Sequence, residues 1–296
     1  MTEKRASGLP FMVASAFAFS TMSALVKEAE VGLPTAEIVC ARAAITLVLS
    51  WLMVRRAGVR PSGTKTGALL LRGTLGFIAL ACYYWTLGRL PLAEATTVHH
   101  TAPIWTAILA WLILRESLAG TTAVALACGM AGVVLVARPG AGGIDMDGAG
   151  LAVAVAGAAA SAAAYVTVRR LVSPDTRQTP SAGGEHPLII VFVFPLVALP
   201  ASLVWAVPQW VTPDAREWLL LAAIGVTTQI GQVCLTYGLS REPAARAMAV
   251  GYLQVVFAVA LGAAIFSEVP PWTTLAGAGL IIGGTAIAAR RRPPRA

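Results

Sequence analysis

The sequence predicts an all-α integral membrane protein whose ten transmembrane helices form a 5+5 inverted-topology repeat around a central cavity. Three observations predict this fold: an apolar composition, ten long apolar segments, and a repeat at constant spacing. Of the 296 residues, 57% are hydrophobic and only 12% are charged, and the mean hydropathy is +0.75. Soluble domains carry about 25% charged residues. A soluble enzyme, a secreted disulfide scaffold and a disordered chain are therefore excluded.

Ten segments are long and apolar enough to cross the hydrocarbon core, which takes about 20 helical residues. In chain order they are Gly8–Val26, Ala36–Val54, Gly67–Gly88, Ala95–Leu114, Thr121–Ala137, Ala149–Val168, Leu188–Val207, Arg216–Gly238, Ala244–Phe266 and Thr273–Ala289. The first also has features of a signal peptide, because Lys4 and Arg5 precede it. It is long enough to span, and the repeat needs it as a partner, so we expect a membrane helix.

The positive charges predict the orientation in the membrane. Of the 22 Lys and Arg, 17 fall on the side of the N-terminus, Arg72 among them, and four fall on the opposite side. The remaining one, Arg42, lies inside a span, where we expect it to pair with Glu37. Cytoplasmic loops are enriched in Lys and Arg. We therefore expect a multi-pass protein of the cell inner membrane with both termini in the cytoplasm.

The two halves of the chain resemble each other. Leu87–Ala95 resembles Leu239–Ala247, 152 residues later, and the same spacing relates Glu116 to Glu268. Each half would hold five helices, and because five is odd the second half enters the membrane from the opposite face. Such inverted repeats occur in many secondary transporters.

We place the first repeat at residues 1–140 and the second at residues 141–296. The longest connection, residues 173–187, holds three prolines and two glycines and is predicted to be a flexible surface loop.

Both halves carry the pattern Leu-x-Arg-x-Pro-x-Ala, preceded by Trp85 in the first half and Tyr237 in the second. In each half an acidic residue, Glu116 or Glu268, follows the apolar segment that comes after this pattern. With the ten spans, these motifs resemble the drug/metabolite transporter superfamily, EamA-type permeases, in the amino-acid and metabolite exporter branch. The resemblance implies a cavity near the midplane, lined by the first, third, fourth, sixth, eighth and ninth helices. It also implies that the second and seventh helices pack outside.

Polar and aromatic side chains within the spans are the candidates for substrate binding, since they are costly at lipid depth unless they line water or protein. They are Tyr83, Tyr84, His99, His100, Trp105, Tyr165, Gln229, Gln232, Tyr252 and Gln254. For each of these residues the alternative is a structural role, either in packing or in hydrogen bonding between helices. Pro103 should bend the fourth span.

Several kinds of chemistry are not expected. No phosphate-binding loop, HExxH motif or serine elbow occurs in the sequence, so we expect no cofactor, no metal and no enzymatic activity. The first helix has no central glutamate, which argues against a cationic drug. Lys and Arg are expected to be absent from the cavity, which argues against phosphorylated substrates.

The sequence thus predicts a transporter that exports small metabolites, foremost neutral or aromatic amino acids, by alternating access. Its expected partners are a small-molecule substrate and the lipid bilayer, with no nucleic acid, and a monomer is compatible with the sequence. Two alternatives stay open: a proton-coupled drug or cation exporter of the same superfamily, and a membrane enzyme or scaffold.

Overall fold

The computed structural model describes residues 7–61, 63–87, 90, 92–138, 148–172 and 184–290, and leaves the side chains of 84, 87 and 92–94 undescribed. Helices make up the whole fold of these residues, without a strand. Most of the predicted loop 173–187 lies outside the described residues.

The first half contains α1 (Leu9–Ala29), α2 (Thr35–Arg56), α3 (Thr66–Leu87), α4 (Leu92–His99), α5 (Ala102–Leu109), a π-helical turn η1 (Ala110–Leu114) and α6 (Gly120–Ala137). The second contains α7 (Gly148–Val172), α8 (Pro187–Ala206), a 3-10 turn η2 (Val207–Gln209), α9 (Ala215–Arg241), α10 (Ala244–Gly251), α11 (Leu253–Phe266) and α12 (Trp272–Arg290). Within the described chain, ten helical spans are long and apolar enough to cross a membrane, which confirms the predicted number.

Two of the spans are interrupted. The fourth breaks between α4 and α5, where Thr101 accepts backbone bonds from Ile104 and Trp105, and Pro103 stands in the first turn of α5. The helix is therefore interrupted close to Pro103, where the bend was predicted. The ninth span breaks at Tyr252, between α10 and α11, without a proline at the break. Gly251, directly before the break, was a weak signal for it, and no break was predicted there.

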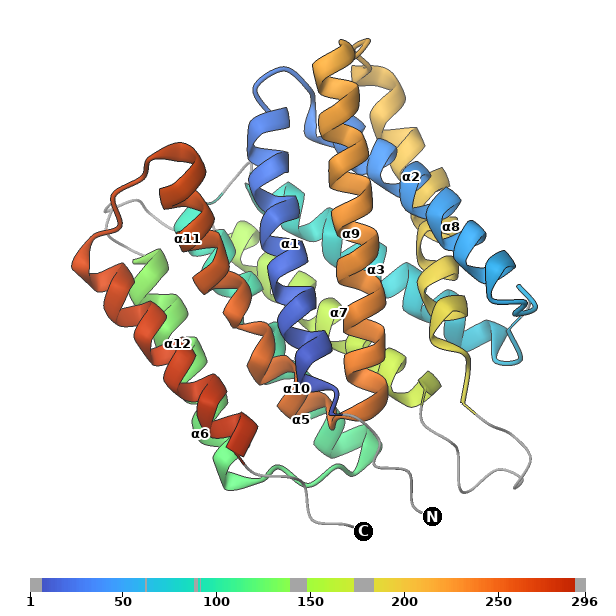
Figure 1. Ribbon diagram of the computed structural model, residues 1–296. Helices are drawn as coiled ribbons and strands as arrows, with labels where there is room; N and C mark the ends of the chain where they lie inside the picture. Colours follow the sequence, from blue (N-terminus) through green and yellow to red (C-terminus); the bar gives the residue numbers. More distant parts are fainter. Residues whose placement is uncertain are drawn as a thin grey trace.

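The helices pack in pairs. α1 packs against α9, α3 against α7, α2 against α8, and α6 against α12. Figure 1 shows α6 and α12 at one edge of the bundle and α2 and α8 at the other, with α1, α9, α3 and α7 between them. The close contact between α6 and α12 requires a glycine at position 132, because a Cβ on Gly132 would lie 2.5 Å from the carbonyl oxygen of Gly277.

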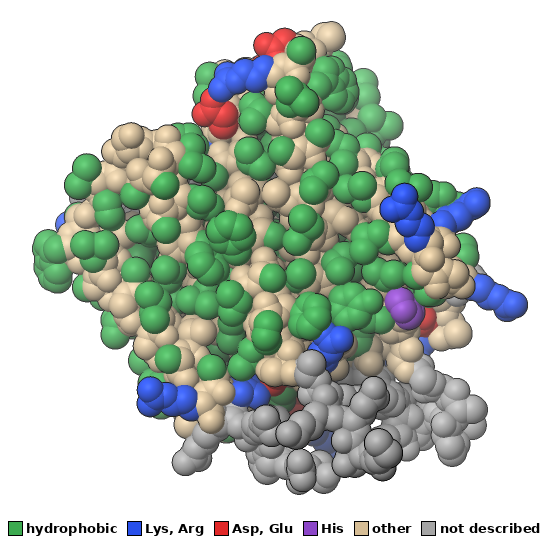
Figure 2. Space-filling view, viewed as in Figure 1, with side chains coloured by type: hydrophobic (Ala, Val, Ile, Leu, Met, Phe, Trp, Pro, Cys, Tyr) green, Lys and Arg blue, Asp and Glu red, His purple; other side chains and the backbone are tan. Residues whose placement is uncertain are grey.

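The outer surface is apolar across its middle. Figure 2 shows hydrophobic side chains over the centre of this face and the charged ones toward its margins. Large side chains such as Val204, Leu219 and Trp111 are 78%, 73% and 59% exposed. An apolar surface of this extent is unfavourable in water and favourable in lipid. The chain is a multi-pass membrane protein.

The start of α1 and the end of α12 are joined through Glu242 and Arg246. The Glu242 carboxylate accepts hydrogen bonds from the backbone N–H of Gly8 (3.0 Å) and from Arg246 (2.7 Å), and Arg246 also donates to the carbonyl oxygen of Ala288 (2.9 Å). Since Gly8 precedes α1 and Ala288 lies in the last turn of α12, the chain enters and leaves the bundle at one end. We call it the terminal end, and the opposite one the far end.

Candidate functional site

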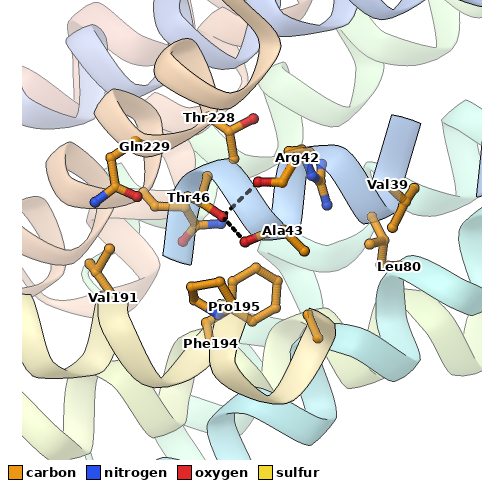
Figure 3. A pocket seen from close by; sticks show the side chains of 12 residues that line it. Val39, Arg42, Ala43, Thr46, Leu80, Val191, Phe194, Pro195, Thr228 and Gln229 are labelled. Carbon is orange, nitrogen blue, oxygen red and sulfur yellow. Dashed lines mark hydrogen bonds between the residues drawn. The ribbon is translucent and has the colours of Figure 1, made fainter. Parts of the chain in front are cut away.

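A small pocket lies at mid-depth between α2, α3, α8 and α9 (Figure 3). Its cavity of about 10 Å³ has room for about one water molecule. It is lined by Val39, Arg42, Ala43, Thr46, Leu80, Val191, Phe194, Pro195, Ala198, Thr228, Gln229 and Gln232. The amides Gln229 and Gln232, predicted to share a face of one helix, both line this pocket.

A buried cation adjoins the pocket. Arg72, on α3, is 4% exposed; its Nη2 donates to Gln232 Oε1 at 3.4 Å, and its guanidinium lies 4.8 Å from the ring centroid of Phe194. In the described part of the chain its Nε and Nη1 have no hydrogen-bond partner. Tyr165, on α7, is close enough to interact electrostatically with Arg72. The site is therefore a cation held by one amide and one aromatic ring.

The expectation that Lys and Arg are absent from the cavity is wrong, because Arg42 lines the pocket and Arg72 is buried beside it. The charge count placed Arg72 on a loop side, although the predicted span Gly67–Gly88 contains it. The structure buries it one to two turns inside α3. An arginine that far inside an apolar segment was the signal that could have identified it.

Arg42 is a second cation at this site, on α2. Its Nη1 lies 3.8 Å from Met22 Sδ, a weak contact. The expected pairing with Glu37 is wrong, because that carboxylate accepts instead from the backbone N–H of Val211 at 3.0 Å. Among the described residues no carboxylate forms an ion pair with Arg42 or with Arg72.

The pocket also holds unsatisfied polar atoms. Gln229 is 5% exposed, with its Nε2 3.4 Å from Met53 Sδ, and within the described structure its Oε1 has no partner. Thr228 Oγ1 is likewise buried without a partner among the residues described. Buried polar groups are normally hydrogen-bonded. An occupant with donors and acceptors would satisfy them.

The pocket is not lined as the resemblance implied. The second and seventh spans, α2 and α8, were expected to pack outside, yet they supply most of its lining. They do so because α2 packs on α8, α8 on α3, and α2 on α9. The first, fourth, sixth and ninth spans contribute none of its lining residues among those described.

Another group of predicted residues gathers on α3 and α4. The rings of Tyr83 and His99 are 4.5 Å apart, and those of His99 and His100 are 5.9 Å apart. His100 Nδ1 donates to the carbonyl oxygen of Thr96 at 2.8 Å. The side chain of Tyr84 lies outside the described residues. Trp105, on α5, is 37% exposed at the surface of the bundle.

The predicted residues of the ninth span lie apart from the pocket. Tyr252 is 1% exposed, and a Cβ on Gly129 would come within 2.2 Å of its ring. Its hydroxyl lies 3.9 Å from Met130 Sδ. The carbonyl oxygen of Gln254 accepts from Ser20 Oγ at 2.6 Å. The surroundings of Tyr252 are those of a packed aromatic ring.

A half-buried ion pair, Glu116–Arg169, lies at the terminal end. Glu116 accepts from Arg169 Nε at 2.7 Å and from the backbone N–H of Ala244 at 2.8 Å, while Arg169 also donates to the carbonyl oxygen of Leu239 at 3.0 Å. The side chains of Glu116 and Arg169 are 18% and 19% exposed. This contact links the end of η1 to α7, α9 and α10.

The far end is more open. A hollow of about 150 Å³ lies between α1 and α11, lined by Ser20, Ser23, Ala24, Lys27, Ala258, Gly262, Phe266 and Glu268. The pair Lys27–Glu268, 2.5 Å apart, crosses it with both side chains more than half exposed. The two ion pairs thus stand at opposite ends of the bundle.

Comparison with curated proteins gives relatives named as transporters. The chain is 35% identical to the pseudopaline exporter of Pseudomonas aeruginosa (strain UCBPP-PA14) over 281 residues, covering 93% of each protein. It is 26% identical to a riboflavin transporter of Vibrio cholerae, covering 93% of this chain and 90% of that protein. It is 27% identical to solute carrier family 35 member G1 of Mus musculus, over 96% of this chain and 78% of that one.

A solved crystal structure shares the fold, with a TM-score of 0.80 over 95% of this chain and 96% of the other at 19% identity. The model of the EamA-like transporter family matches twice, at residues 6–138 and 148–290. These two matches cover nearly all of the described helices. The chain therefore belongs to the EamA-like transporter family.

Proposed function

We propose that this protein exports small amino-acid-like metabolites across the cell inner membrane by alternating access, as a monomer with cytoplasmic termini and without catalysis. The observation that carries the proposal is the pocket at mid-depth with unsatisfied polar atoms, built into a transporter fold. Its polar atoms suit the backbone groups of an amino acid. Leu80, Val191 and Phe194 offer apolar surface to a side chain.

An inverted repeat would supply the two exchanging halves. Arg115 and Ser267, 152 residues apart, both adopt left-handed backbone conformations, with φ of 56° and 55°. The next N–H in each case, of Glu116 and Glu268, donates six residues back at 3.3 Å. The family model also matches once in each half. These correspondences support the two five-span units proposed for residues 1–140 and 141–296.

Access would alternate through the two ends. The Glu116–Arg169 ion pair joins the helices at the terminal end. At the far end, the exposed pair Lys27–Glu268 crosses an open hollow. Breaking the first contact and tightening the second would open the terminal end and close the far end. The pocket has room for about one water molecule in this structure, so it must widen to take a solute.

A cationic drug fits this pocket poorly. Arg42 lines it and Arg72 adjoins it, and none of the lining residues that the structure describes is acidic. Two positive charges disfavour a third at short range in a low-dielectric setting. The observed charges therefore favour an amino-acid-like solute over the drug or cation alternative.

Counterflow in proteoliposomes tests the proposal. Purified protein would be loaded with each of the twenty amino acids, several sugars and several quaternary amines, and uptake of the labelled compound measured. We expect exchange of at least one amino acid and none of the quaternary amines. Folded, monodisperse protein that exchanges no compound of the panel would contradict the proposed function.

A further inference from the structure

Two buried arginines in this chain have opposite surroundings. Arg246, 7% exposed, donates to the carboxylate of Glu242 and to two backbone carbonyl oxygens at the end of α12. Every nitrogen of its guanidinium has a partner. Arg72 is buried as deeply, yet within the described structure only its Nη2 has one, the amide oxygen of Gln232.

A structural arginine in lipid-buried protein is expected to look like Arg246. Burying a cation is costly unless it is paired and hydrogen-bonded, and ionisable residues inside membrane spans are retained mostly for function. The 3.4 Å bond from Arg72 to Gln232 is longer than the usual 2.7–3.2 Å. This long hydrogen bond stabilises the buried positive charge only weakly. Arg72 is therefore a buried cation whose Nε and Nη1 have no hydrogen-bond partner among the described residues.

The surroundings of Arg72 leave room for its guanidinium. Gly76 lies one turn further along α3, and a Cβ there would come within 2.5 Å of Arg72 Nη1. The ring of Phe194 covers one face of the guanidinium. Gln232 and Phe194 also line the pocket, so the cation stands at its wall.

We propose that Arg72, assisted by Arg42, binds a carboxylate of the exported solute, so that the substrate class is small metabolites with at least one free carboxylate. The inference rests on the proposed function and narrows it. Guanidinium groups form strong, charge-assisted hydrogen bonds to carboxylates. One cation that lines the pocket and a second beside it, without an acid among the described lining residues, favour negative charge in the occupant.

The unsatisfied oxygens define the other end of the solute. Gln229 Oε1 and Thr228 Oγ1 are acceptors on α9, one turn before Gln232. An amino group on the solute would donate to them while its carboxylate contacts Arg72. A compound in which an amide replaces the carboxylate keeps the size and loses the charge, and should be rejected.

The test measures carboxylate selectivity in proteoliposomes. Counterflow is recorded for glutamate, leucine and phenylalanine, each beside its α-carboxamide. For the wild type we expect at least one acid to exchange about tenfold or more faster than its amide. Arg72→Gln should bring that ratio near one. Arg170→Gln, which removes an exposed charge at the end of α7, should keep the wild-type ratio.

The outcomes separate the two proposals. If the wild type exchanges none of the six compounds or of the wider panel, the proposed function fails. If it exchanges acids and amides equally, or if folded Arg72→Gln keeps the wild-type ratio, export stands and the carboxylate site is wrong. If Arg72→Gln does not fold, Arg72→Lys is tested instead. Lysine lacks the planar guanidinium that binds a carboxylate through two hydrogen bonds, so we expect the ratio of acid to amide exchange to fall at least about threefold. An unchanged ratio would overturn the inference.

Discussion

Gln232 is the only hydrogen-bond acceptor of Arg72 in the described structure, and it also lines the pocket. Gln232→Ala should therefore loosen the guanidinium and remove one polar contact to the solute. We expect the half-saturating solute concentration in counterflow to rise about five- to tenfold, which corresponds to the loss of one ordinary hydrogen bond of about 1 kcal/mol. Initial rates over a range of solute concentrations measure this effect.

Gln209→Ala is the matched control, because Gln209 is exposed on η2, away from the pocket. It should leave the concentration dependence unchanged. If Gln232→Ala and Gln209→Ala had the same half-saturating concentration, Gln232 would take no part in solute binding.

The sequence revealed part of this site. The spacing of Gln229 and Gln232 placed both amides on one face, and the structure brings them to one pocket. Arg72 was missed because the charge count assigned it to a loop, although the predicted span Gly67–Gly88 contains it. Whether a polar residue packs or binds depends on neighbours from distant spans, and Tyr252 shows this: its surroundings come from Gly129 and Met130 on α6.

At the scale of elements, α6 and α12 depend on glycine at their contact. A Cβ on Gly132 would lie 2.5 Å from a backbone oxygen of Gly277, which cannot move aside as a side chain can. Gly132→Ala should force the helices apart and cost about 1–3 kcal/mol of stability. Gly279→Ala, on α12, meets nothing within 4 Å and should be neutral or slightly stabilising.

Thermal unfolding in detergent compares the two variants directly. A loss of stability for Gly279→Ala equal to that for Gly132→Ala would mean that the α6–α12 contact is not the cause.

The spans themselves were largely predictable because apolar length is a local property. The predicted segments Ala95–Leu114 and Ala244–Phe266 have the same bounds as the observed spans. The interruption near Pro103 followed from the missing N–H of proline. The one at Tyr252 was not predicted, because it has no proline and only Gly251 precedes it. The close packing of α2 on α8 likewise depends on contacts between spans.

At the scale of the whole molecule, the two ends differ in strength. Glu116 has a half-buried cation and a backbone N–H as partners, whereas Glu268 has one exposed lysine. Exposed pairs contribute about 0–1 kcal/mol. Glu116→Gln should therefore shift the protein toward a state open at the terminal end, and Glu268→Gln should change little.

Labelling of single cysteines placed near each end, in a background without the four native cysteines, measures this shift. A larger effect of Glu268→Gln than of Glu116→Gln would contradict the assigned difference between the ends.

The central claim is that one mid-depth pocket faces the two sides of the membrane in turn. Thr228 lines that pocket and is 2% exposed, and Thr228→Cys in the cysteine-free protein keeps the size of the side chain. Its labelling by a small membrane-impermeant thiol reagent, applied to oriented vesicles from either side, tests the claim most directly. We predict labelling from both sides, slowed by transported solute. Labelling from one side only, in protein that still exchanges solute, would contradict it.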